Sequence, residues 1–113
     1  MNSTYTYNEK VSIATTILNQ LGGRRFTFMT GAKNLELLDG GIKMSIGRNA
    51  TSANRFEVVY DGGRDLYIMR FVREAFSRKT FTASRKVLKE YDGIYCDQLE
   101  SLFSNFTGLA TRF

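Results

Sequence analysis

Apolar residues recur every three or four positions over the first part of the chain, which is the spacing of one face of an α-helix. The recurring residues are Val11, Ala14, Ile17, Leu18 and Leu21. Thr6 and Glu9 have the spacing of a capping box, Asn8 is a second candidate cap, and Gly22-Gly23 is a typical stop signal. We therefore predict an amphipathic helix that ends at Leu21.

The pattern then changes to the two-residue alternation of β-strands. Candidate strands cover residues 26–30, 35–38, 42–46, 55–60 and 66–73. Two Asp-Gly-Gly segments, which begin at Asp39 and Asp61, separate pairs of these runs and predict hairpin turns. Between the hairpins, residues 47–54 are polar and predict an exposed loop that carries Arg48.

The run 66–73 is largely apolar on both of its faces. One face holds Leu66, Ile68, Arg70 and Val72, and the other holds Tyr67, Met69, Phe71 and Arg73. Either this strand is central and covered on both sides, which is the commoner arrangement when helices flank a sheet, or one face is an exposed aromatic platform.

Residues 77–91 have no clear periodicity. Strand, helix and loop all stay open here, and one interpretation is a short strand at 79–82 followed by a short basic helix at 84–91. Asp92-Gly93 ends the segment.

Helical spacing returns from about Tyr95 to Phe106, and Gly108 is the stop signal. These elements together predict one α+β domain over residues 1–113. We expect an antiparallel sheet of four or five strands, built from two Gly-rich hairpins and packed by an N-terminal and a C-terminal helix.

Composition indicates the cellular compartment in which this domain is expected. The chain has 113 residues and a single cysteine, Cys96, which cannot form an internal disulfide, so a reducing compartment is expected. No signal peptide opens the sequence, and no apolar run approaches the roughly 20 residues that a membrane helix needs. We expect a protein of the cytoplasm, with no membrane partner.

Several kinds of chemistry have no support in the sequence. The chain contains no histidine, which removes the commonest general base and the commonest transition-metal ligand. The Cys96 thiol lies near Asp97 and Glu100, and nearby negative charge disfavours a reactive thiolate. We therefore predict no catalytic residue, no metal and no cofactor.

The segment Thr30-Gly31-Ala32-Lys33-Asn34 has a weak similarity to a phosphate loop. It lacks the first glycine and the hydroxyl residue after lysine, so a tight turn after a strand is the commoner arrangement. Lys33, like Arg48 in the polar loop, remains a weak candidate for contact with a phosphate.

Positive charge is concentrated in one region of the sequence. Residues 64–89 have a net charge of +6, whereas the last 24 residues have −3 and the whole chain +5. The basic residues of the region are Arg64, Arg70, Arg73, Arg78, Lys79, Arg85, Lys86 and Lys89. Such a field favours a polyanionic partner, and nucleic acid is the commonest one.

We predict that these residues bind phosphates while Tyr67 and Phe71 stack on bases, with single-stranded DNA as the expected ligand. The competing interpretation is that both rings belong to the core and that the charges solvate a surface. A second hypothesis is that the chain binds a protein of a host cell and acts as its inhibitor or as an adaptor. The acidic residues Glu90, Asp92, Asp97 and Glu100, placed on or beside the last helix, also suggest a homodimer through the basic region of another copy.

Several segments taken together resemble a family of small uncharacterised proteins of bacteriophages and other bacterial mobile elements. The similar segments are, in chain order, Ile17 to Gly23, Phe26 with Met29 to Asn34 (MTGAKN), Asp65 to Tyr67 with Phe71 and Arg73, Tyr95 to Leu99 with Phe103, and Thr107-Gly108-Leu109. The resemblance spans most of the chain, and it implies a phage or prophage origin without any catalytic residue. The basic stretch 77–90 is longer here than in the family pattern.

Overall fold

The fold is a five-stranded antiparallel meander with helices before and after it. The structure, a computed structural model, describes residues 5–109. The helices are α1 (Tyr7–Leu21), α2 (Arg24–Thr30), the short 3-10 helix η1 (Cys96–Gln98) and α3 (Leu99–Thr107). The strands are β1 (Lys33–Leu38), β2 (Gly41–Ser45), β3 (Arg55–Asp61), β4 (Leu66–Ser77) and β5 (Thr82–Ile94), and each pairs with the next. The predicted α+β class is confirmed.

Helix α1 forms as its sequence predicts. The Thr6 hydroxyl accepts a hydrogen bond from the Glu9 backbone N–H at 3.3 Å, and the Glu9 carboxylate accepts one from the Thr6 N–H at 2.9 Å. Gly22 closes the helix with a φ of 124°, which favours glycine. Ala14, Ile17 and Leu21 are buried against the sheet. Both hydrogen bonds satisfy backbone donors that the first turn leaves without partners.

The predicted strand at 26–30 is wrong, because these residues form helix α2. Phe26 and Thr30 are buried and Phe28 is exposed, so the positions that face the core are four residues apart rather than two. The helix lies between Gly23 at a φ of 62° and Gly31 at a φ of 69°. The order of aromatic and small residues in this segment is therefore compatible with both a strand and a helix, and packing against the core selects the helix.

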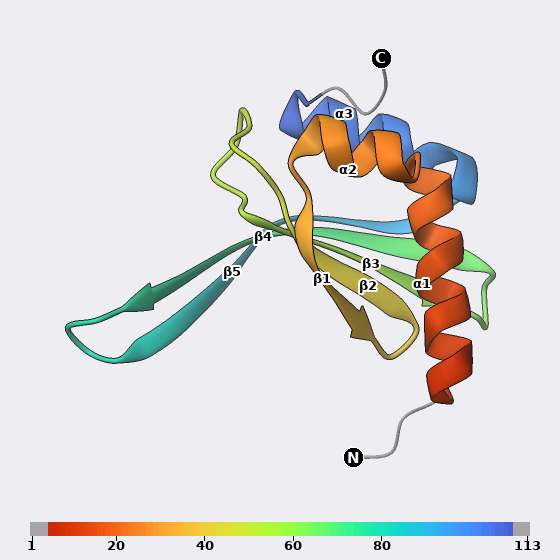
Figure 1. The fold of residues 1–113 in the computed structure, drawn as a ribbon, viewed down its shortest axis with the longest axis horizontal. Coiled ribbons are helices and arrows are strands. Elements are labelled where there is room, and N and C mark those ends of the chain that lie inside the picture. The colour runs from red at the N-terminus through yellow and green to blue at the C-terminus, as the bar shows by residue number, and fades with distance from the viewer. Residues whose placement is uncertain (1–4, 110–113) are drawn as a thin grey trace.

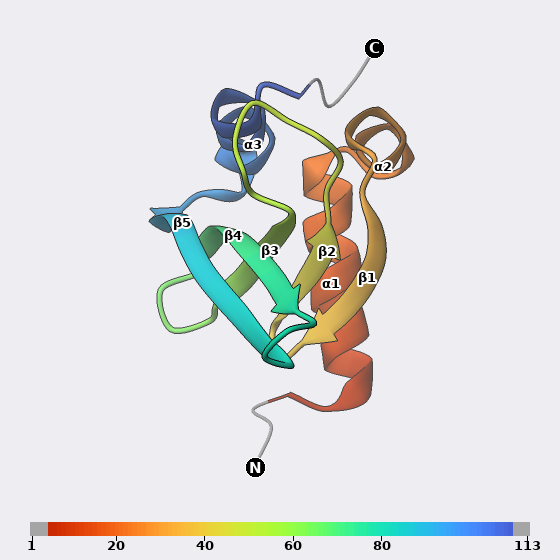
Figure 2. The same cartoon turned by 90° about the vertical axis from the view of Figure 1, so that its left-hand side faces the viewer.

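One core joins the helices to a single face of the sheet (Figures 1 and 2). Its centre is a group of phenylalanines, in which the ring centroid of Phe103 lies 4.8 Å from that of Phe26 and 4.9 Å from that of Phe56. The Phe71 ring stacks at 5.0 Å on Phe56 and at 4.3 Å on Phe106. Phe71 is fully buried and Tyr67 nearly so, which means that neither ring is an exposed platform.

The opposite face of the sheet is covered by charge pairs, so the expectation of a strand with helices on both sides is also wrong. One residue from each strand forms a cross-strand row in the order Glu36, Lys43, Glu57, Arg70 and Glu90. The sign of the charge alternates along this row. Direct neighbours of opposite charge stabilise antiparallel pairs, so this face neutralises itself.

Strand β5 replaces the short basic helix considered for residues 84–91. It pairs with β4 from Tyr67 opposite Ile94 to Ser77 opposite Thr82, with two register shifts. Its residues 82–87 are all exposed because the outer part of the hairpin extends beyond the core. A strand with no buried face has no hydrophobic alternation, which explains why the sequence pattern was uninformative.

The C-terminal helix begins later than predicted, with the 3-10 turn η1 from Cys96 and then α3 from Leu99. Leu99, Phe103 and Thr107 are its buried residues, and Gly108 ends it at a φ of 75°. Within residues 5–109 no helix is long and apolar enough to cross a membrane.

Candidate nucleic-acid interface

The outer half of the β4–β5 hairpin projects away from the rest of the protein as a two-stranded arm (Figure 1). We define the arm as residues 73–86, with a ladder from Arg73 opposite Lys86 to Ser77 opposite Thr82 and a tip at residues 78–81. Every residue of the arm is exposed except Glu74, which is half-buried. At about 3.4 Å per residue, the paired part from Arg73 to Ser77 is roughly 14 Å long.

Two exposed phenylalanines lie at the outer end of the arm. The Phe76 side chain is 61% exposed and the Phe81 side chain 79%. Their ring centroids are 6.5 Å apart, and the rings meet edge to face. Such rings are usually buried in soluble proteins, so this pair is an apolar surface available to a partner.

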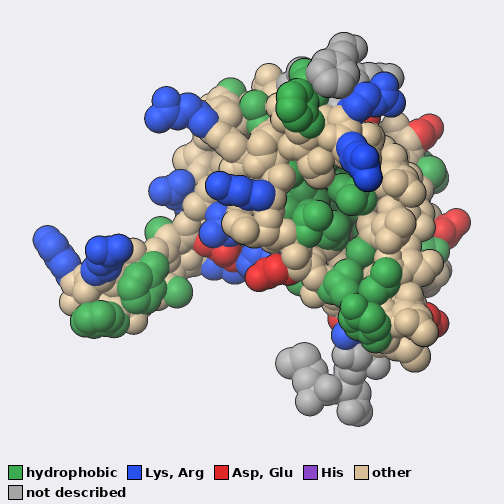
Figure 3. Space-filling model, viewed as in Figure 1, with side chains coloured by type: hydrophobic (Ala, Val, Ile, Leu, Met, Phe, Trp, Pro, Cys, Tyr) green, Lys and Arg blue, Asp and Glu red, His purple; other side chains and the backbone are tan. Residues whose placement is uncertain are grey.

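Four cations of the arm have no acidic partner among residues 5–109, two at its tip and two at its base. They are Arg73, Arg78, Lys79 and Lys86. Arg73 donates a long hydrogen bond of 3.4 Å to the Ser52 carbonyl oxygen, and it remains exposed. Figure 3 shows basic and hydrophobic side chains side by side on the projecting arm. The arm therefore combines uncompensated positive charge with exposed aromatic rings.

Two other residues of the predicted basic site, Arg64 and Arg70, form ion pairs. Arg64 lies 2.7 Å from Asp61 and 2.5 Å from Asp92, and the hydrogen bonds to Asp92 and Asp61 raise its pKa further. Arg70 lies 2.6 Å from Glu90. Arg64 and Arg70, which the sequence predicted to contact phosphates, thus have acidic partners inside the protein.

Arg85 joins the arm to the body of the sheet. Its two terminal nitrogens lie 2.5 Å and 2.9 Å from the two oxygens of Glu57, a carboxylate that is almost fully buried. Hydrogen bonding to Glu57 raises the pKa of Arg85, so the guanidinium stays charged. A bidentate pair of this kind has a fixed geometry, and it holds the direction in which the arm leaves the sheet.

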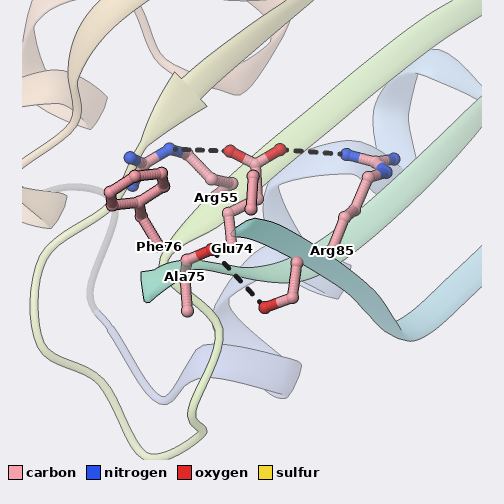
Figure 4. A pocket seen from close by; sticks show the side chains of 7 residues that line it. Arg55, Glu74, Ala75, Phe76 and Arg85 are labelled. Carbon is pink, nitrogen blue, oxygen red and sulfur yellow. Dashed lines mark hydrogen bonds and ion pairs between the residues drawn. The ribbon is translucent and has the colours of Figure 1, made fainter. Parts of the chain in front are cut away.

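Glu74 strengthens the same junction, as Figure 4 shows at the base of the arm. Its carboxylate lies 2.7 Å from Lys43, 3.3 Å from Arg55 and 3.4 Å from Arg85. The hydrogen bond from Lys43 is the main reason that the pKa of Glu74 falls below its ordinary value. Arg85, which the sequence predicted as a phosphate ligand, is thus paired with Glu57 and Glu74 at this junction.

The remaining basic residues that the sequence proposed as phosphate contacts are Lys89 on β5, Lys33 on β1 and Arg48 in the loop between β2 and β3. Lys89 is exposed, with its ammonium 5.0 Å from the centre of the Tyr91 ring. Lys33 and Arg48 are exposed on adjacent segments, since the Gly47 N–H donates to the Thr30 carbonyl at 3.0 Å.

The segment that contains Lys33 follows the C-terminus of α2, where the helix dipole is negative, whereas a phosphate loop precedes a helix. The expected turn after a strand is thus a helix C-cap, and its backbone does not favour a phosphate.

The acidic residues that suggested a homodimer are also placed differently. Glu90 and Asp92 belong to β5 rather than to the last helix, and both are paired inside the chain with Arg70 and Arg64. The charge complementarity expected between two copies is therefore reduced. Among the described residues, no group of three His, Cys, Asp or Glu side chains is arranged to hold a metal ion.

Sequence reasoning missed Phe76 and Phe81, although a sign of them was present. Both rings flank Arg78-Lys79 in a stretch with no other large apolar residue between them. A buried element of this length would contain more apolar positions, so isolated aromatic residues in a basic segment indicate an exposed contact surface.

Comparison with protein-family models, with curated proteins and with solved structures finds no match for this chain. The resemblance to phage and mobile-element proteins therefore remains a prediction, as does a location in the host cytoplasm.

Proposed function

We propose that the protein is a non-enzymatic nucleic-acid-binding protein of phage type, and that the arm is its contact surface. The observation that carries the proposal is the difference between two sets of cations. Arg64, Arg70 and Arg85 are paired with carboxylates, whereas Arg73, Arg78, Lys79 and Lys86 on the arm have no acidic partner among the described residues. Cations without internal partners are the ones that can replace the counterions of a phosphate backbone.

The salt dependence of binding follows from the number of these cations. Each phosphate contact contributes about −0.9 to the slope of log K against log salt for duplex DNA, and about −0.7 for single strands. Four contacts would produce a slope of roughly −3 to −4. A slope near zero would be incompatible with the proposal.

Fluorescence anisotropy with labelled oligonucleotides at several salt concentrations tests the assignment to the arm. The variant Arg78→Ala/Lys79→Ala should weaken binding and flatten the slope by about 1.4 to 1.8 units. Its matched control is Arg24→Ala/Arg25→Ala, which removes the same net charge from exposed positions on α2. Equal effects of the two variants would show that only net charge matters, and the arm would lose its assigned role.

A second candidate function is the binding of a host protein. An apolar groove between α1 and the edge strand β1 is lined by Val11, Leu18, Leu35 and Leu37, and the last two are exposed. Leucines exposed along a sheet edge favour a protein partner. Capture of a host protein that survives nuclease treatment, and that Leu35→Ser/Leu37→Ser abolishes, would favour this candidate. Loss of all captured protein after nuclease treatment would favour the arm.

A further inference from the structure

The shape of the arm bears on which nucleic acid it would bind. Proteins that bind single strands commonly place their cations in a groove that follows the backbone. Here the cations lie on a convex ribbon, and the rings once expected to form a stacking surface, Tyr67 and Phe71, are in the core. A convex ribbon requires a concave partner, and the grooves of a duplex are concave.

The outer end of the arm presents exposed apolar side chains of the kind that insert between base pairs. Proteins that enter the minor groove often insert apolar side chains between base pairs, and the inserted group unstacks the step and bends the duplex. Phe76 and Phe81 contact each other and are both exposed, so together they present one apolar edge. The edge-to-face geometry leaves no parallel slot between the rings in which a single base could be sandwiched.

The cations are distributed in a way that suits this arrangement. Arg78 and Lys79 lie at the tip beside the rings, whereas Arg73 and Lys86 lie opposite each other at the base of the arm. The two sets are separated by about 14 Å of ladder, which corresponds to roughly four phosphate intervals along one strand. Phosphates could thus be contacted on both sides of the step that the rings enter.

We propose, as a deepening that rests on the function proposed above, that the arm enters the minor groove of duplex DNA and that Phe76 and Phe81 wedge into a base-pair step. The ligand class is B-form DNA, because the wide, shallow minor groove of duplex RNA does not enclose a ribbon. The rigid junction through Arg85 and Glu57 holds the arm in position, so the duplex bends. Steps that unstack easily, or that already contain a mismatch, should bind more tightly.

The test uses one short DNA duplex with a fluorophore at each end and a fluorescent base analogue at a central flexible step. The wild-type protein should shorten the distance between the ends and increase the emission of the analogue as it becomes unstacked. It should bind a mismatched duplex about tenfold or more tightly than the matched one. A small ligand that fills the minor groove should compete with it.

The variant Phe76→Ala/Phe81→Ala isolates the wedge from the charge. It should retain the salt slope of the wild type and lose both the bend and the preference for the mismatch. The variant Phe76→Leu/Phe81→Leu preserves an apolar edge and should retain part of the bend. It also keeps the test decisive if the alanine variant loosens the hairpin, which far-ultraviolet circular dichroism would reveal.

The outcomes separate this inference from the proposed function. If the Arg78→Ala/Lys79→Ala variant keeps the wild-type slope, the arm is not the nucleic-acid interface and both proposals fail. If the slope depends on these cations but the wild type binds single strands more tightly than duplexes, the wedge is overturned and the proposed function stands. A bend that survives in the alanine variant also overturns the wedge alone.

Discussion

Replacement of Phe71 by alanine distinguishes a core residue from a base-stacking residue. The Phe71 ring is fully buried between the strands and α3, and its centroid lies within 6 Å of those of Phe56, Phe103 and Phe106. The substitution removes a ring that these three rings surround and leaves a cavity in its place. The three rings belong to β3 and α3, so they cannot fill the cavity unless the backbone of these elements moves. We therefore expect a large loss of stability.

The magnitude can be worked from this environment. Truncation of a buried phenylalanine to alanine costs about 3–5 kcal/mol, which includes the cavity that remains. Domains of this size unfold with about 5–15 kcal/mol, so the substitution would remove between about a fifth and all of the free energy of unfolding. With a denaturant slope of about 2 kcal/mol per M urea, the unfolding midpoint should fall by about 2 M.

Urea titration followed by circular dichroism measures this loss, and Phe76→Ala is the matched control. The control deletes the same atoms from a ring that is 61% exposed, so its free energy of unfolding should change by less than about 1 kcal/mol. A wild-type midpoint for Phe71→Ala would refute the assignment of Phe71 to the core. If that variant also lost affinity for oligonucleotides, the exposed aromatic platform would be restored as the better explanation.

Three further predictions concern a close contact between β2 and β3, a tyrosine and the junction of the arm. Gly41→Ala should cost at least about 1–3 kcal/mol, because its Cβ would clash with a backbone carbonyl oxygen of β3. Tyr60 donates to Asp65 at 2.6 Å, which raises its pKa to about 12, so Asp65→Asn should return its ionisation towards 10 in an ultraviolet titration. The pKa of Glu74 is lowered, chiefly by the hydrogen bond from Lys43, so its ionised form stabilises the fold above about pH 4.5. This contribution disappears as the pH falls through the lowered pKa. Glu74→Gln should therefore reduce the amount of stability that the protein loses between neutral and acid pH.

Each of these predictions has a result that contradicts it. Gly63→Ala is the control for the first, because a Cβ at Gly63 has only ordinary contacts, and equal effects of the two variants would exclude the clash. For the tyrosine, an unchanged titration curve in Asp65→Asn would show that the hydrogen bond does not set the pKa. For the junction, an acid unfolding profile of Glu74→Gln that matches the wild type would mean that other carboxylates control it.

Local chemistry was sufficient for the elements that the sequence predicted correctly. The capping box at Thr6 and Glu9 and the apolar stripe up to Leu21 determine α1, since the cap bonds and the helical spacing both lie within one segment of the sequence. The Asp-Gly segments at Asp39 and Asp61 determine the two hairpins, because the turn residues and the alternating runs that flank them are adjacent in sequence. The α+β class and the antiparallel sheet follow from these elements.

The remaining features depend on contacts between distant parts of the chain. Residues 26–30 are helical because only the four-residue spacing of Phe26 and Thr30 reaches the core that α3 and β3 complete. The role of Phe71 depends on whether a helix covers its face of β4, and the sequence of the strand does not contain that information.

The candidate site was decided in the same way. A basic residue is available to phosphates only if no carboxylate lies beside it. Arg70 and Arg85 meet Glu90 and Glu57, which lie 20 and 28 residues away along the chain, whereas Arg78 and Lys79 lie on an arm beyond the reach of any carboxylate in the described chain. The sequence by itself determined the amount of positive charge and the local turns. Only the tertiary structure decided which charges the fold neutralises and which it leaves for a partner, because ion pairing depends on distance in space and not along the chain.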